Sequence, residues 1–109
     1  MDEAGLRGLM GLSVRAGQAV FGEDGCMKAL RGGGCALLLM DGAISAAARE
    51  KYLGVCARTG TRSAVLPEGL IAQATGRPGK AMALRRGALA DRLAACLDEA
   101  EETTGYFKA

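Results

Sequence analysis

The feature that most constrains the fold is an uninterrupted apolar run at residues 35–40, CALLLM, which is followed by Asp41-Gly42. Such a run is too short for a membrane-spanning helix, which needs roughly 20 residues. An apolar run without polar alternation is typical of a central β-strand that is buried on both faces. Because helices must cover both faces of such a sheet, the run predicts a layered α/β domain.

Helical and strand-like segments alternate along the rest of the chain. Apolar residues at helical spacing predict helices over about residues 3–16, 23–31, 45–59, 67–75 and 89–97, and short apolar runs predict strands at 19–21, 35–40, 63–66 and 81–84. Ser45 suits a helix N-cap, and Pro67 suits the first position of a helix. The alternation predicts a three-layer α/β/α sandwich with a parallel or mixed sheet.

Length and charge indicate one domain with a basic body. We expect a single domain over residues 1–100 and a flexible tail over 101–109. Residues 1–97 carry 13 Lys and Arg against 8 Asp and Glu, a net charge of +5, and four acidic residues follow between 98 and 102. A basic body of this kind suits a polyanionic partner.

Cysteine and histidine usage argues against several kinds of chemistry. The chain has no His, and its cysteines at 26, 35, 56 and 96 show no C-x-x-C spacing, so we expect no zinc site, no cofactor and no enzymatic activity. Cys26, beside Lys28, is the one candidate nucleophile, yet its spacing with Ala29 and Leu30 places it inward. The absence of a signal-like N-terminus and the free thiols favour the cytoplasm and no membrane association.

The basic residues are the strongest candidates for a binding surface. The sequence contains neither of the glycine-rich phosphate-binding motifs G-x-G-x-x-G and G-x-x-x-x-G-K-[ST]. Cations recur in pairs on the second helix, in a turn and in a loop: Lys28 and Arg31, Arg77 and Lys80, Arg85 and Arg86. If strand ends and helix N-termini converge on one edge, some of them face a phosphate backbone. The alternative is ordinary solvated surface charge.

The order of motifs carries a family resemblance. The motifs are Leu9-Met10-Gly11-Leu12, Arg15-Ala16-Gly17, Val20, Gly22-Glu23-Asp24 and Lys28-Ala29-Leu30. This pattern resembles the bacterial YlxQ-like branch of the ribosomal protein L7Ae family of kink-turn RNA-binding proteins, over roughly residues 6–95. The resemblance implies an L7Ae/L30e-like fold with a small mixed four-stranded sheet. It also implies a ribosome-associated or RNA-maturation role in binding structured RNA, with no small-molecule substrate.

The resemblance also assigns roles at the predicted RNA site. Gly22 allows close backbone approach, Glu23 and Asp24 offer acceptors to guanine edges, and Lys28 meets base or phosphate oxygens. A loop that covers flipped-out bases is formed by Val65, Leu66, Pro67 and Glu68. The predicted set is completed by Gly25, Arg31, Arg77, Lys80 and Arg86.

One departure from the family pattern motivates an alternative. RNA binders of the family carry Asn-Glu where this chain has Asp24-Gly25. The alternative hypothesis is a protein-interaction module of the same fold that has lost kink-turn specificity, and it predicts an exposed apolar patch.

Overall fold

The computed structural model describes residues 3–104, and side chains as far as Glu99. Five helices and four strands alternate within this range. In chain order they are α1 (Glu3–Arg15), β1 (Ala19–Phe21), α2 (Glu23–Arg31), β2 (Cys35–Asp41), α3 (Ala46–Thr59), β3 (Arg62–Leu66), α4 (Leu70–Thr75), β4 (Ala81–Arg85) and α5 (Ala88–Thr104).

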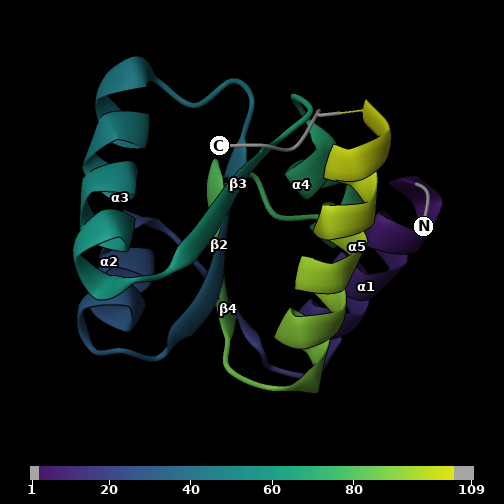
Figure 1. The fold of residues 1–109 in the computed structure, drawn as a ribbon, viewed down its shortest axis with the longest axis horizontal. Helices are drawn as coiled ribbons and strands as arrows, with labels where there is room; N and C mark the ends of the chain where they lie inside the picture. The colour runs from purple at the N-terminus through teal and green to yellow at the C-terminus, as the bar shows by residue number, and fades with distance from the viewer. Residues whose placement is uncertain (1–2, 105–109) are drawn as a thin grey trace.

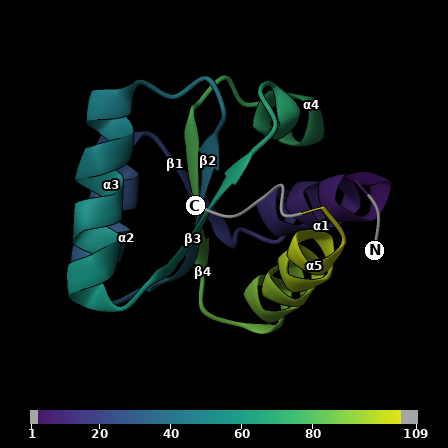
Figure 2. The ribbon, with the colours of Figure 1, turned by 45° about the horizontal axis from the view of Figure 1, so that its top comes forward.

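The strands form one mixed sheet in the order β1-β4-β2-β3. Strands β2 and β3 are parallel, whereas β4 runs antiparallel to both of its neighbours, β1 and β2. Helices α2 and α3 cover one face of the sheet, and α1, α4 and α5 cover the other (Figures 1 and 2). The predicted three-layer α/β/α sandwich with a small mixed sheet is therefore confirmed.

The central run at residues 35–40 is buried on both faces, as its composition predicts. Leu37 and Leu39 pack into the cluster beneath α1, α4 and α5, while Leu38 and Met40 pack into the cluster beneath α2 and α3. All four side chains are at most 1% exposed. The alternation of strand side chains thus divides one apolar run between two hydrophobic cores.

The antiparallel direction of β4 decides which loops meet. The ends of β1, β2 and β3 lie at the same edge of the sheet as the start of β4, because Phe21 pairs with Met82, Met40 with Ala81 and Asp41 with Leu66. We call this the upper edge, residues 21–24, 41–45, 67–69 and 77–81. The opposite, lower end contains residues 17–19, 31–35, 59–62 and 85–88.

Two sequence predictions about element boundaries need correction. Pro67 does not open a helix, since α4 begins at Leu70 after Gly69, which adopts a left-handed backbone with φ of 84°. A turn precedes it, in which the Leu70 N–H donates to the Pro67 carbonyl at 3.1 Å. Helix α5 continues to Thr104, so residues 101–104 of the predicted tail are helical. The rest of that tail, 105–109, lies outside the described residues.

Candidate functional site

A buried carboxylate joins three segments at the upper edge. Asp41, at the end of β2, is only 2% exposed. Its Oδ1 accepts from the Ala43 N–H at 2.8 Å, and its Oδ2 accepts from the Gly69 N–H at 2.9 Å. Its own N–H donates to the Lys80 carbonyl at 2.8 Å. Charge-assisted bonds of this kind are stronger than neutral ones, so Asp41 fixes the loops that follow β2 and β3 beside the start of β4.

The same two loops also touch directly through a glycine. A Cβ on Gly42 would lie 3.0 Å from the Leu66 carbonyl oxygen and 3.1 Å from the Glu68 nitrogen. Both neighbours are backbone atoms, which cannot move aside as a flexible side chain can. Gly42 therefore allows the β2–α3 loop to pack against the segment that leads from β3 to α4.

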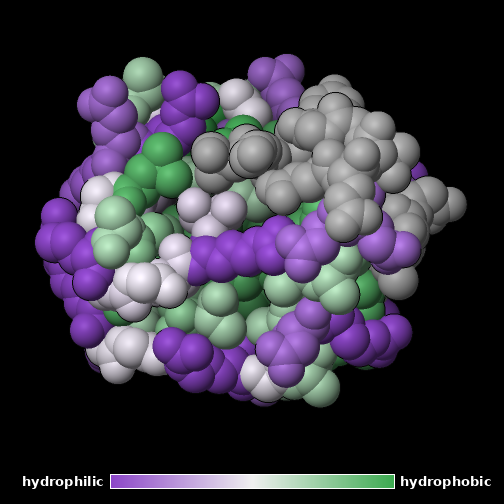
Figure 3. Space-filling model, viewed as in Figure 1, coloured by the Kyte–Doolittle hydropathy of each residue, from purple (hydrophilic) through white to green (hydrophobic). Residues whose placement is uncertain are grey.

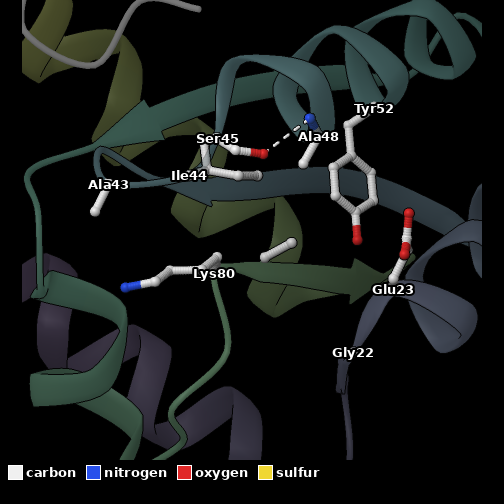
Figure 4. Close-up of a pocket in the computed structure, with 9 residues that line it drawn as sticks. Gly22, Glu23, Ala43, Ile44, Ser45, Ala48, Tyr52 and Lys80 are labelled. Carbon is white, nitrogen blue, oxygen red and sulfur yellow. Dashed lines mark hydrogen bonds between the residues drawn. The ribbon is translucent and has the colours of Figure 1, made fainter.

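An open pocket of about 400 Å³ lies beside this junction. Three segments of the upper edge and the first turns of α3 line it (Figure 4): Gly22, Glu23, Ala43, Ile44, Ser45, Ala48, Tyr52, Lys80 and Ala81. Ser45 caps α3, where its Oγ accepts from the Ala48 N–H at 3.1 Å. Lys80 is exposed, and its ammonium group points away from Glu23 (Figure 4). The pocket volume falls in the range of small-ligand sites and is large enough for a nucleobase.

The start of α2 forms one wall of the pocket. Gly22 has φ of 85° and ψ of 151°, and no side chain caps the helix N-terminus. The positive φ explains why glycine stands here, and a Cβ there would meet nothing within 4 Å. Glu23 forms an exposed ion pair with Lys51 of α3, at 2.8 Å between Oε1 and Nζ. Asp24 is exposed. Backbone donors and two carboxylates therefore face solvent together.

A tyrosine forms the inner wall on the α3 side. Tyr52 is 4% exposed, and its hydroxyl points toward Glu23 (Figure 4). Burial, together with the neighbouring Cys26 and Glu23, raises the pKa of the Tyr52 phenol to about 12. Burial also raises the pKa of the Cys26 thiol to about 11, despite hydrogen bonds from the Ala83 backbone and Tyr52. Cys26 is fully buried in the cluster beneath α2 and α3, so its thiol is a packing group there.

An arginine stacks on an aromatic ring at the same edge. The Arg77 guanidinium lies 5.0 Å from the centroid of the Phe21 ring, within cation–π range. Phe21 ends β1 and directly precedes Gly22, so the stack is adjacent to the start of α2. Lys80 supplies exposed positive charge at the pocket, and Arg77 supplies exposed positive charge elsewhere on the same edge, beside Phe21.

The structure brings together seven of the predicted RNA-site residues. At the upper edge lie Gly22, Glu23, Asp24, Pro67, Glu68, Arg77 and Lys80. The prediction for Val65 and Leu66 is wrong in one respect: they belong to strand β3, not to a loop, and Leu66 is 1% exposed. Leu66 is instead a core residue, since its strand position points inward.

The remaining predicted residues lie elsewhere. Gly25 faces β1, where a Cβ would lie 2.8 Å from Val20 Cγ1, so close helix–strand packing accounts for this glycine. Lys28, Arg31 and Arg86 do not join the upper edge. Lys28 and Arg31 lie in the last turns of α2, and Arg86 follows the end of β4.

Sequence reasoning missed three residues of the site. Asp41 was interpreted only as the end of a strand, and Ile44 and Tyr52 were not placed near Gly22. The strict apolar run before Asp41 was the available signal, because a carboxylate that continues a buried strand needs hydrogen-bond partners. The pairing of α2 with α3 around the pocket depends on tertiary contacts that no local pattern encodes.

Two further searches concern the described residues alone. Between residues 3 and 104, no helix is both long and apolar enough to cross a bilayer. In the same part of the chain, no group of His, Cys, Asp and Glu side chains has the geometry to hold a metal ion.

Comparison with known proteins identifies the fold. No protein-family model and no curated protein matches the chain. Among solved structures, a protein of unknown function from Bacillus halodurans C is similar, with a TM-score of 0.80 and 23% identity over 85% of this chain and 96% of the other.

Two further structures share the fold. The Giardia lamblia 15.5kD RNA binding protein matches with a TM-score of 0.70 and 14% identity, over 94% of this chain and 91% of its own. The Thermoplasma acidophilum Pelota protein matches with a TM-score of 0.61 and 16% identity, over 77% of this chain but 28% of its own length. These neighbours are consistent with the L7Ae/L30e-like fold that the sequence predicts.

Proposed function

We propose that this protein is a non-catalytic RNA-binding protein that recognises structured RNA through the upper edge. The observation that carries the proposal is the pocket of about 400 Å³ between the uncapped start of α2, Tyr52 and Lys80. In this proposal the pocket receives one unstacked base, since sequence-specific RNA recognition targets bases that leave the stack.

We assign phosphate contacts to the basic residues of the upper edge and base contacts to its acidic residues. Lys80 at the pocket and Arg77 elsewhere on the upper edge hold phosphates, because both are exposed cations. Asp24 accepts hydrogen bonds from base edges, since a carboxylate beside phosphates is unfavourable without a donor. Glu23 can take the same role through Oε2, and through Oε1 as well when its exposed ion pair with Lys51 opens. Such exposed pairs are worth about 0–1 kcal/mol, so opening costs little.

We further propose that the RNA is a kink-turn or a related bend, and that the protein belongs to the YlxQ-like branch and acts on the ribosome or in RNA maturation in the cytoplasm. The support is the motif order around Gly22-Glu23-Asp24 and the fold shared with the Giardia lamblia 15.5kD RNA binding protein. The preorganised loops around Asp41 favour a rigid RNA shape over a flexible strand.

The protein-interaction hypothesis predicts an exposed apolar patch on the surface of the protein. Among the described side chains, Leu12 is the one large hydrophobic residue that is exposed, at 39%. On the face shown in Figure 3, hydrophobic residues form separate spots that are interrupted by hydrophilic ones. A broad apolar patch, which that hypothesis predicts, is not seen there.

The proposal is tested by titrating labelled structured RNA with the wild type and with Lys80→Ala. Loss of one phosphate contact should weaken binding about fivefold and lower the slope of log affinity against log salt by about 1. Arg92→Ala, which removes an exposed charge from α5 on the other face of the sheet, is the matched control. Equal affinities for all three proteins would refute the proposed site.

A further inference from the structure

A second basic surface lies at the lower end, away from the proposed site. Four exposed cations converge there from α2 and from the end of β4: Lys28, Arg31, Arg85 and Arg86. We call this group the lower basic cluster. Lys28 and Arg31 are three positions apart on one helix, so they project from the same side of α2.

The lower basic cluster surrounds a hollow of its own. A pocket of about 400 Å³ is lined by Lys28 and Arg85, with Val20 and Ala29 as its apolar side chains and Gly25, Gly32 and Gly34 leaving bare backbone. Arg86 reaches the same turn, because its Nε donates to the Gly33 carbonyl at 3.0 Å. The charged groups of Lys28, Arg85 and Arg86 therefore border an open groove. Its glycine residues have no side chains, so a ligand can approach the backbone closely.

The charge of this cluster is not neutralised by the protein. Among the side chains that the structure describes, ion pairs join Lys51 to Glu23 and Arg62 to Asp98, and none involves the four cations of the cluster. The negative C-terminal end of α2 accounts for Lys28 and Arg31 in its last turns. Arg86, which follows β4, donates to the Gly33 carbonyl just past the end of α2, so it also complements that helix end. Arg85 ends β4, and the helix end gives no reason for its presence.

The lower basic cluster and the upper edge flank opposite ends of the sheet. Strand β2 has seven residues, which at about 3.3 Å per residue span about 23 Å between these ends. Helix α2 runs from one to the other, with Lys28 four positions after Asp24. The upper edge also carries the carboxylates Glu23, Asp24 and Glu68, whereas the lower basic cluster consists of cations alone. The upper edge can therefore make both acidic and basic contacts, whereas the lower basic cluster offers positive charge alone.

We propose that the lower basic cluster binds the phosphodiester backbone of a second segment of the RNA that occupies the upper edge. This inference rests on the proposed RNA-binding function and extends it to a second site. Phosphate oxygens suit the site because guanidinium groups bind them in a bidentate manner and the glycine backbone leaves room for close approach. The groove has two small apolar side chains, Val20 and Ala29, so it offers little to the side chains of a peptide.

The test compares two RNAs that share the same bend. One is a short hairpin, and the other has a stem longer than the 30 Å long axis of the protein. The variant Arg85→Gln/Arg86→Gln removes two charges from the cluster. Arg7→Gln/Arg92→Gln removes the same charge from α1 and α5, which cover the other face of the sheet. Binding is measured by fluorescence anisotropy at two salt concentrations.

We expect the Arg85/Arg86 variant to bind the long RNA about tenfold more weakly, with a salt slope lower by about 1–2, and to bind the short hairpin like the wild type. The control variant should bind both RNAs like the wild type. A long RNA bound equally well by the wild type and the Arg85/Arg86 variant would overturn the second site, while a loss in Lys80→Ala would still uphold the proposed function.

Two other outcomes would also overturn the proposal. If the wild type binds neither RNA, the proposed function and the second site fail together. If poly-glutamate binds the wild type and not the Arg85/Arg86 variant, while the long RNA binds both equally, the lower basic cluster serves an acidic protein partner instead.

Discussion

Replacing Asp41 by Asn should destabilise the protein although the two side chains have nearly the same shape. One carboxylate oxygen becomes an NH2 group, which cannot accept from the N–H of Ala43 or Gly69, now 2.8 Å and 2.9 Å from the two oxygens. The remaining bond loses its charge. Hydrogen bonds to charged groups are worth about 1.5–3 kcal/mol each, so we expect a loss of about 2–4 kcal/mol of unfolding free energy.

The loss is measured by urea unfolding followed by circular dichroism. With a urea dependence of about 1–2 kcal/mol per M, the midpoint should fall by about 1–4 M. Glu50→Gln, on the exposed side of α3, makes the same chemical change at the surface and should stay within about 0.5 kcal/mol of the wild type. An Asp41→Asn midpoint equal to that of Glu50→Gln would refute the role given to Asp41 in joining the loops.

Three other predictions concern packing, titration and capping. Gly25→Ala should lower the unfolding free energy by about 1–3 kcal/mol, because its Cβ would lie 2.8 Å from a valine methyl group. Gly8→Ala, whose Cβ would meet nothing within 4 Å, should stabilise α1 by about 0.5–1 kcal/mol. Thermal unfolding of the two variants measures both changes. Burial raises the pKa of Cys26 and of Cys56 from 9.0 to about 11, so stability should be full below pH 9 and fall as pH rises toward 11. Urea midpoints at about pH 8 and about pH 10 check this fall, which Cys56→Ala should reduce. Ser45→Ala should lower the unfolding free energy by about 1 kcal/mol through loss of the cap on α3, and an unchanged urea midpoint would contradict this.

Local patterns in the sequence were sufficient for the order of elements. The apolar run at 35–40 predicted a central strand because only a strand can divide six consecutive apolar residues between two cores. The helices predicted over 45–59 and 67–75 end where the structure ends them, because Gly60 and Gly76 follow and adopt the left-handed backbone that glycine favours. Pro67 misled because Gly69, two positions later, makes a turn that delays the helix.

The arrangement of the site could not be predicted in the same way. Lys80 and Arg86 are separated by one short strand, yet they lie at opposite ends of the sheet. Which loops each of them meets depends on the direction of β4, which local pattern does not encode. Likewise, the Asp41 carboxylate accepts a hydrogen bond from the N–H of Gly69, 28 residues away, and neither local sequence predicts that contact. Tertiary pairing, rather than residue type, assembles the upper edge.

The most direct test of RNA recognition at the upper edge is a titration with a labelled kink-turn RNA and with a control in which the G·A pairs are replaced. Both are measured at two salt concentrations, with the wild type and with Lys80→Ala. The account predicts selective binding of the kink-turn RNA that weakens with salt and in Lys80→Ala. Equal, weak binding of both RNAs by both proteins would contradict it.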